Sequence, residues 1–192
     1  MRRASLLAVL GAVLVVGFAG VALAAVITCT GGTCTGTLQD DVITGSAQRD
    51  VIFARAGNDR VEARAGDDEL NGDQGNDTLL GETGNDLYNG NRGDDTLTED
   101  ANSTSNDEMF GGQNNDEMSG GGGDDFLSGQ VGNDTVAGGE GIDDHRGGDG
   151  NDTINARDGL RDTLVSGGPG TDTCFFDPID PRPRECEIQN PQ

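Results

Sequence analysis

A single apolar position recurs along most of this chain at a spacing of nine residues. Between residues 72 and 98 the unit is written three times without interruption, as GDQGNDTLL, GETGNDLYN and GNRGDDTLT. Numbered from its first Gly, the unit has Gly again at position four, Asn or Asp at five, Asp at six and an apolar residue at eight. A fixed period of this kind predicts a stacked, repetitive fold.

The apolar position predicts short strands. Because only position eight is reliably apolar, positions seven to nine predict a strand that turns one side chain inward and two outward. Positions one to six predict a turn, since Gly supplies positive φ and Asn or Asp at five tolerates the left-handed region. The column at position eight has one polar member, and it consists of Ile43, Ile52, Val61, Leu70, Leu79, Tyr88, Leu97, Met109, Met118, Leu127, Val136, His145, Ile154, Leu164 and Cys174.

The Asp at position six is the second fixed feature, and it predicts metal binding. Calcium takes six to eight oxygen ligands, from carboxylates and backbone carbonyls, and Gly-rich turns leave their carbonyls unobstructed. Turns stacked about 4.8 Å apart would bring a second set of oxygens within reach. The alternative is that Gly and Asp only mark solvated turns, which need no Asp at a fixed position. With a three-residue insertion before Asp107 and two longer units at the end, the Asp recurs at Asp41, Asp50, Asp59, Asp68, Asp77, Asp86, Asp95, Asp107, Asp116, Asp125, Asp134, Asp143, Asp152, Asp162 and Asp172.

The units GGGGDDFLS at 120–128 and GGDGNDTIN at 147–155 resemble the nonapeptide of the repeats-in-toxin (RTX) family of hemolysin-type calcium-binding repeats. The resemblance covers residues 36–174. It implies an all-β parallel β-roll, or β-solenoid, in which two nonapeptides make one coil and several calcium ions lie between turns stacked on the same side. It also implies that Asp68 stacks with Asp86, Asp77 with Asp95, and Asp134 with both Asp116 and Asp152. We expect about seven coils. The calcium ligands that follow from this comparison are Asp59, Asp68, Asp77, Asp86, Asp95, Asp116, Asp125, Asp134, Asp143, Asp152 and Asp172.

Departures from the unit predict weaker binding in the first turns. Gln39 and Gln48 replace Gly at position four in the units of the first two Asp residues. Ala54 and Ala63 replace Gly at position one in the next two units. Calcium should therefore bind less tightly at this end of the roll.

Two later segments also depart from the unit. The stretch 99–106, EDANSTSN, carries the insertion and contains no Gly, which predicts a bulged loop and a missing or poor site beside Asp107. Residues 157–162 depart again from the turn pattern, so Asp162 is left out of the expected ligands.

The amino terminus has the pattern of a secretory signal. Two Arg residues precede an uncharged run over residues 4–24 that ends in Ala22-Leu23-Ala24, which predicts cleavage after Ala24. The run is also long enough to span a bilayer, so a membrane anchor formed by residues 4–24 is the alternative. In both cases the rest of the chain faces the outside of the cell.

Four cysteines flank the repeats and predict disulfide-stapled ends. Cysteines of exported chains usually pair, and of three connectivities proximity favours Cys29 with Cys34 and Cys174 with Cys186. Free or metal-binding thiols are the alternative, although neither pair has zinc-site spacing. The expected organisation is a signal peptide at 1–24, an N-terminal disulfide cap at 25–35, the β-roll at 36–174 and a C-terminal disulfide cap and tail at 175–192.

Charge and composition restrict the classes of function that this chain can have. The formal net charge is -23, so the surface repels nucleic acid and attracts cations. We expect no enzymatic activity. His145 is the chain's only His and lies at a core position. The paired carboxylates recur in every coil, which indicates repeated metal sites and not one acid–base pair. The function predicted is that of a secreted, monomeric calcium-binding protein that folds on calcium and acts as a structural or surface-associated module, with a partner at the cell surface or in the matrix.

An adhesive or ice-binding β-solenoid is the alternative function. Ice binding would favour a flat rank of Thr on one face. Position three argues against it, because this position holds Gln74, Thr83, Arg92, Gln113, Gly122, Val131 and Glu140.

Overall fold

The computed structural model describes residues 13–14 and 24–191 of the chain. The expected signal peptide at 1–24, and with it the alternative anchor at 4–24, lies almost wholly outside these residues. The described part of the chain contains no helix that is long and apolar enough to cross a membrane.

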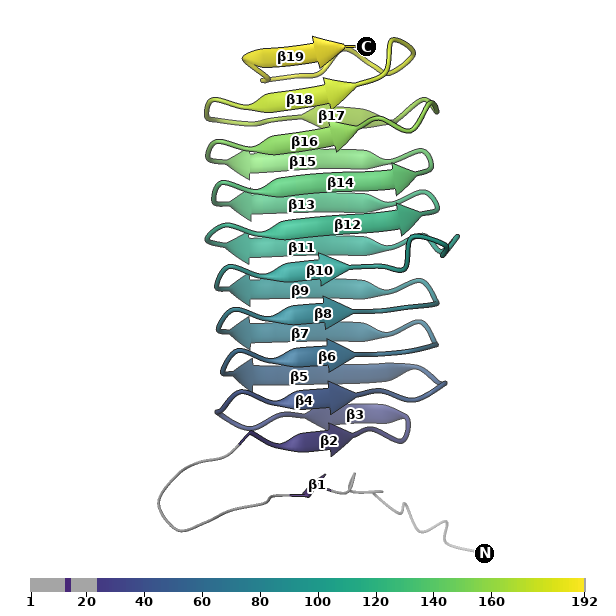
Figure 1. Ribbon diagram of the computed structural model, residues 1–192, viewed down its shortest axis with the longest axis vertical. Helices are drawn as coiled ribbons and strands as arrows, with labels where there is room; N and C mark the ends of the chain where they lie inside the picture. Colours follow the sequence, from purple (N-terminus) through teal and green to yellow (C-terminus); the bar gives the residue numbers. More distant parts are fainter. Residues whose placement is uncertain (1–12, 15–23, 192) are drawn as a thin grey trace, which may run out of the picture.

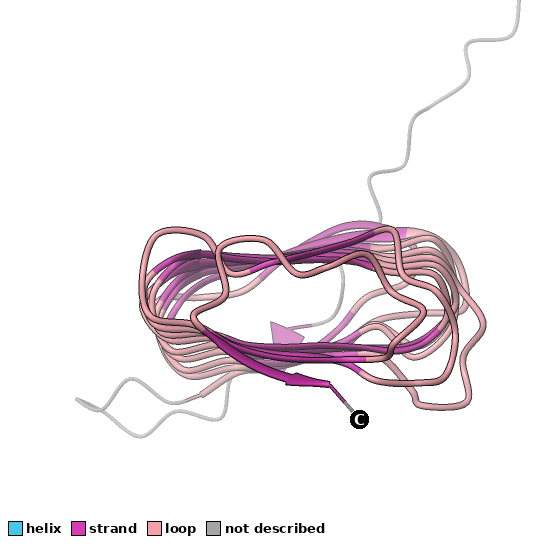
Figure 2. Ribbon diagram, turned by 90° about the horizontal axis from the view of Figure 1, so that it is seen from above, coloured by secondary structure: helices cyan, strands magenta, loops and turns pink. Residues whose placement is uncertain are grey.

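The chain winds into a stack of coils, each contributing one strand to each of two facing sheets (Figure 1). Seen from above, the coils superimpose as a flattened ring, with strands along the two long sides and turns at the two ends (Figure 2). The first sheet has eleven strands, in the order β1 (Val13–Leu14), β2 (Val26–Thr28), β4 (Val42–Thr44), β6 (Arg60–Glu62), β8 (Thr78–Leu80), β10 (Thr96–Thr98), β12 (Glu117–Gly122), β14 (Thr135–Glu140), β16 (Thr153–Ala156), β18 (Thr173–Phe176) and β19 (Ile188–Pro191). The second sheet has eight strands, in the order β17 (Leu164–Ser166), β15 (Asp144–Asp149), β13 (Phe126–Val131), β11 (Glu108–Gln113), β9 (Leu87–Arg92), β7 (Glu69–Gln74), β5 (Asp50–Ala56) and β3 (Gly32–Thr35).

The strands pair in parallel, apart from the antiparallel contact of β1 with β2. Neighbouring strands in a sheet are two units apart, so that Leu79 lies opposite Leu97 and Leu70 opposite Tyr88. Two nonapeptides therefore make one coil, which confirms the predicted all-β parallel β-roll. Each coil contributes one strand to the second sheet, so the eight strands of this sheet correspond to eight coils, close to the seven expected.

The position-eight column forms the core. Its members from Ile43 to Ile154 are all at most 1% exposed, His145 included. Leu164 is the one error in the predicted column, because the buried residue of β17 is Val165, which lies opposite His145. This coil has an extra residue between its Asp and its strand, where both Thr163 and Leu164 direct their N–H groups to the carbonyl of Asp143. The extra residue shifts the inward position by one.

Two local predictions need correction. Most strands of the second sheet continue beyond position nine into positions one to three of the next unit, as in Glu69–Gln74. The pairing skips position one, because Asn71 pairs with Asn89 and Asp73 with Asn91. The positive φ predicted for position five lies at position two instead, for example 73° at Asp73. The residue at position two follows the unpaired residue at position one, and its backbone conformation allows the strand to resume its pairing with the neighbouring strand.

Both predicted disulfides are present. Cys29 bonds to Cys34 between the first two strands of the roll, and Cys174 of β18 bonds to Cys186. The described chain has no free cysteine. The segments expected to be caps also extend the sheets, since β2 and β3 pair with β4 and β5, and β19 pairs with β18.

Candidate metal centres in the stacked turns

The position-six Asp residues form two rows, one at each end of the flattened ring. Every member is at most 3% exposed. The first Asp row precedes the strands of the eleven-stranded sheet and consists of Asp41, Asp59, Asp77, Asp95, Asp116, Asp134, Asp152 and Asp172. The second Asp row lies at or just before the start of the strands of the eight-stranded sheet and consists of Asp50, Asp68, Asp86, Asp107, Asp125, Asp143 and Asp162.

One carboxylate oxygen of each of these Asp residues, except Asp50, links two coils. The N–H of Asp59 donates to Oδ1 of Asp77 over 2.8 Å, and the N–H of Asp77 donates to Oδ1 of Asp95 over 2.8 Å. The carbonyl of Asp77 also accepts a 2.8 Å bond from the N–H of Thr96. The contact repeats along both rows, and the stacked pairs expected from the RTX resemblance are neighbours in it.

The other carboxylate oxygen is buried and has no hydrogen-bond partner among the residues that the structure describes. A buried polar atom of this kind calls for a ligand, because its loss of water is otherwise uncompensated. The arrangement is repeated at Oδ2 of Asp59, Asp68, Asp77, Asp86, Asp95, Asp107, Asp116, Asp125, Asp134, Asp152, Asp162 and Asp172.

Gly at position one leaves room beside this oxygen. A Cβ on Gly72 would lie 2.4 Å from Oδ2 of Asp77 and 2.9 Å from the carbonyl oxygen of Gly90 in the next coil. The free carboxylate oxygen and a backbone carbonyl oxygen thus meet where the chain has no side chain. Such a set of hard oxygen donors suits calcium.

Position five forms a second ladder that sequence reasoning missed. The N–H of Asn76 donates to Oδ1 of Asn58 over 2.9 Å, and the N–H of Asp94 donates to Oδ1 of Asn76 over 3.1 Å. This ladder runs in the opposite direction to the Asp rows and is exposed. The side-chain oxygen at five binds a backbone N–H, which explains the recurring Asn or Asp there without a left-handed backbone.

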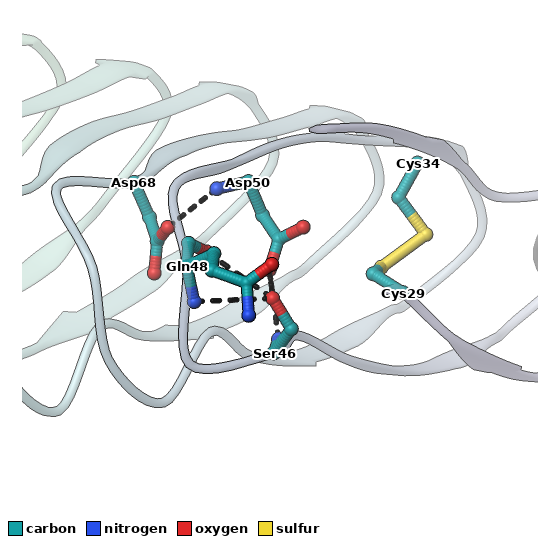
Figure 3. Close-up of a disulfide and its surroundings, with 6 residues drawn as sticks. All are labelled: Cys29, Cys34, Ser46, Gln48, Asp50 and Asp68. Atoms are coloured by element: carbon teal, nitrogen blue, oxygen red, sulfur yellow. Dashed lines mark hydrogen bonds between the residues drawn. A yellow bond between two sulfur atoms is a disulfide. The ribbon is translucent and has the colours of Figure 1, made fainter. Parts of the chain in front are cut away.

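The first unit of each Asp row differs from those that follow. Both oxygens of Asp41 accept hydrogen bonds, Oδ1 from Ala25 over 2.8 Å and Oδ2 from the N–H of Thr37 over 2.5 Å. Oδ2 of Asp50 accepts bonds from the N–H and the hydroxyl of Ser46, at 2.7 and 2.9 Å (Figure 3). Protein groups therefore occupy both oxygens of Asp41 and Oδ2 of Asp50, whereas Oδ1 of Asp50 is buried without a hydrogen-bond partner among the described residues.

The insertion forms the expected bulged loop, which projects from the stack between β10 and β11 (Figure 1). Asp107 after it has the same buried, unpartnered Oδ2 as the expected ligands other than Asp143, and so has Asp162. Glu99 at the start of the loop is 3% exposed, and its carboxylate lies near those of Asp86 and Asp107. Sequence reasoning missed Glu99, although a Glu at position one, where the other units carry mainly Gly, was the available signal.

Burial makes the rows costly to charge. It raises the pKa of Asp86, Asp116 and Asp125 to about 8, and neighbouring carboxylates add to the effect. Burial also raises the pKa of Asp77 and Asp134, to about 6, although the backbone hydrogen bonds that these carboxylates accept lower it. The ion pairs formed by Arg49, Arg60 and Arg146 go to carboxylates outside the two rows, namely Glu69, Glu62 and Asp144. The rows therefore need protons or a bound cation.

His145 has the structural position expected of it. The ring is buried, and Nε2 accepts a 2.9 Å bond from the N–H of Gly138. Burial lowers the pKa of His145 to about 4, so the ring is neutral at physiological pH. Its other nitrogen lies 3.8 Å from Oδ2 of Asp162.

Comparison with protein families agrees with this geometry. The family model for the RTX calcium-binding nonapeptide repeat matches residues 35–70, 62–97, 103–136, 110–144 and 137–159, well over half of the chain. No curated protein matches the chain. The matched segments contain most of both Asp rows, and the free oxygens of these rows are donors that calcium prefers. The chain therefore belongs to the family of RTX calcium-binding nonapeptide repeats, and calcium is the metal it binds.

Proposed function

We propose that this chain is an extracellular protein that folds on calcium and acts as a structural or surface-associated module. The observation that carries the proposal is the repeated pair of a bound Oδ1 and a buried, unpartnered Oδ2 along both rows. The proposed ligands are the carboxylates expected from the sequence, Asp59, Asp68, Asp77, Asp86, Asp95, Asp116, Asp125, Asp134, Asp143, Asp152 and Asp172.

Folding on calcium follows from the thin core. Each unit buries about one apolar side chain, and the burial of one side chain does not offset the conformational entropy lost when nine residues become ordered. Stacking the turns also brings carboxylates into rows that repel one another when charged. Calcium removes the repulsion, and because a complete site exists only in the folded roll, its binding free energy stabilises the fold.

An extracellular location is supported by the disulfides and by the kind of site. Disulfides persist in oxidising compartments, and both ends of this roll carry one. Calcium sites of extracellular modules work at about 10⁻⁴ to 10⁻³ M calcium, which suits a chain with many similar sites.

A purely binding role is supported by the site chemistry. The carboxylates are repeated along the stack, whereas acid–base catalysis needs two groups with different environments. The one His is neutral and bound to a backbone N–H.

The module acts as a monomer on a cell-surface or matrix partner.

An ice-binding or adhesive face is the second candidate, and one observation favours it. Position seven of the eleven-stranded sheet brings Thr78 opposite Thr96, and Thr153 between Thr135 and Thr173. Glu117 interrupts this rank. Thermal hysteresis or inhibition of ice recrystallisation by the calcium-loaded protein would support this candidate, and its absence would remove the ice-binding form of it.

The calcium proposal is tested on metal-stripped protein. Far-ultraviolet circular dichroism should show a largely unstructured chain in chelator and a β spectrum in millimolar calcium. Magnesium should substitute poorly, because it demands regular octahedral geometry. Titration calorimetry should give several calcium ions per chain. A β spectrum and melting temperature that do not change after confirmed metal removal would refute folding on calcium, and one ion or none would refute the stacked sites.

A further inference from the structure

Glu99 occupies a place that belongs to Gly in the neighbouring coils. Leu97 lies opposite Leu79 and Met118, so Glu99 corresponds to Gly81 before it and Gly120 after it. Its side chain lies inside the roll at 3% exposure. The chain thus carries an acidic side chain where the repeat has none.

Two early units carry Ala54 and Ala63 at this place, but in the units with Gly a side chain would collide with the carboxylate of the row. A Cβ on Gly81 would lie 2.2 Å from Oδ2 of Asp86, and one on Gly120 would lie 2.3 Å from Oδ2 of Asp125. In those units the Gly and the Asp are five residues apart, whereas Glu99 and Asp107 are eight apart because of the insertion. The longer turn therefore provides the room that Glu99 needs.

Three buried carboxylates meet there. Asp86, Glu99 and Asp107 each place an oxygen within 4.8 Å of the others. Their remaining contacts use only part of their capacity, since Oδ1 of Asp86 and Oδ1 of Asp107 each accept one backbone bond of 2.7 Å. Oδ2 of Asp86 and Oδ2 of Asp107 are buried, and no described residue offers either of them a hydrogen bond. Unpartnered oxygens of two nearly inaccessible side chains point to a ligand in this cluster.

Tyr88 completes the cluster with a neutral oxygen. Its hydroxyl donates a 2.7 Å bond to Oε2 of Glu99, while Oε1 of Glu99 accepts a 2.9 Å bond from the N–H of Asp100. Tyr88 is fully buried. A Cβ on Gly81 would lie 2.1 Å from the Tyr88 hydroxyl and 2.8 Å from Oε2 of Glu99, so these oxygens converge on the same bare backbone.

We propose that Asp86, Glu99 and Asp107 form a calcium site of their own class, in which the insertion supplies a third carboxylate that the repeat sites lack. The inference rests on the proposed calcium binding and deepens it. Three negative charges in one buried cluster attract a divalent ion more strongly than the carboxylate pairs of the repeat. The ion joins the end of β10 to the turns before β9 and β11, and so holds the roll together where the repeat is interrupted.

The site can be observed separately from the others, because Tyr88 is the chain's only Tyr and there is no Trp. Terbium replaces calcium at oxygen sites, and its luminescence, excited through Tyr88, reports ions near this ring. We expect terbium added to metal-stripped, full-length protein to give this signal in the first part of the titration, and calcium to displace it. Tyr88→Phe should abolish the signal and thereby identify the donor.

Glu99→Gln tests the third carboxylate at nearly constant shape. It should weaken the tyrosine-sensitised terbium signal at least tenfold in affinity and remove one calcium ion in calorimetry. Glu108→Gln, the same change at an exposed glutamate on β11, is the matched control and should leave both measurements as in the wild type. Circular dichroism in saturating calcium verifies that each variant folds.

The outcomes separate the two proposals. If Glu99→Gln binds terbium with wild-type affinity while calorimetry still shows several calcium ions, the separate site is refuted and the repeat sites stand. If the wild type binds no calcium at all, the proposed function fails as well. Should Glu99→Gln not fold, Glu99→Asp takes its place, because it keeps the charge but withdraws the oxygens by one methylene. Unchanged terbium affinity in that variant would also overturn the proposal.

Discussion

The backbone N–H of Asp134 donates a 2.8 Å hydrogen bond to Oδ1 of Asp152, one coil further along the roll. Oδ2 of Asp152 is buried and unpartnered within the described chain. The two oxygens of one carboxylate therefore have separate tasks, since one holds adjacent coils together and the other is left for the cation. An Asp→Asn change separates these tasks, because the amide keeps an acceptor oxygen and loses the charge.

The first prediction compares Asp134→Asn with Asp50→Asn. Asp134→Asn should remove at least one calcium ion in titration calorimetry, because its Oδ2 is free for the metal. Asp50→Asn should have a smaller effect, because Ser46 occupies its Oδ2, leaving only Oδ1 without a partner, and Gln48 replaces the Gly of its turn. Asp134→Ala, which also loses the coil contact, should melt lower than Asp134→Asn in saturating calcium. Equal calcium losses at the two positions would contradict the different roles assigned to them.

The second prediction concerns pH in the absence of metal. The pKa of Asp86, Asp116 and Asp125 is raised by burial from 3.8 to about 8, so the folded roll retains protons that the unfolded chain releases. This contribution to stability is fully present below about pH 4 and is lost as the pH rises through about 8. Metal-stripped protein should therefore show more β structure by circular dichroism at about pH 5 than at about pH 8. Saturating calcium should abolish the difference, and structure that increases with pH in metal-free protein would contradict the prediction.

The third prediction tests the bare backbone at position one. A Cβ on Gly129 would lie 2.2 Å from Oδ2 of Asp134 and 2.6 Å from the carbonyl oxygen of Gly147. Gly129→Ala should therefore displace the carboxylate, cost about 1 to 3 kcal/mol of stability and lower the calcium stoichiometry. Gly159→Ala is the control, because its Cβ meets no atom within 4 Å and only a φ of +88° is strained. The control should lose about 1 kcal/mol and no calcium. Unchanged calcium binding in Gly129→Ala would show that the space is not needed.

The fourth prediction ranks the two disulfides. The bond from Cys29 spans 5 residues and the bond from Cys174 spans 12. Loop-closure entropy gives about 2 kcal/mol for the shorter loop and about 3 kcal/mol for the longer one. In saturating calcium, denaturant titration of the Cys174→Ala/Cys186→Ala double variant should show the larger loss. The Cys29→Ala/Cys34→Ala variant should lose less, and the reverse order would contradict the ranking.

The nine-residue period determined the architecture. One apolar residue and one Asp in each unit predicted a stacked, repetitive fold, and the resemblance to the RTX nonapeptide implied the parallel coils and the pairing of Asp77 with Asp95 that the structure shows. The disulfides also followed from the sequence, since each pair is close in the chain. The turn, the strand and the inward residue are the same in nearly every unit. These features can therefore be predicted from the sequence of a single unit.

The tertiary structure decided the features that break the repeat. The inward residue of β17 is Val165 and not Leu164, because the register of a strand is set by its neighbour and not by counting along the chain. The division of each carboxylate into a bound and a free oxygen also depends on the adjacent coil. Glu99 shows this most clearly, since its sequence context indicated a poor site. Only the stacking of β9, β10 and β11 brings its carboxylate to Asp86 and Asp107, which are far from one another in the sequence and adjacent in the roll.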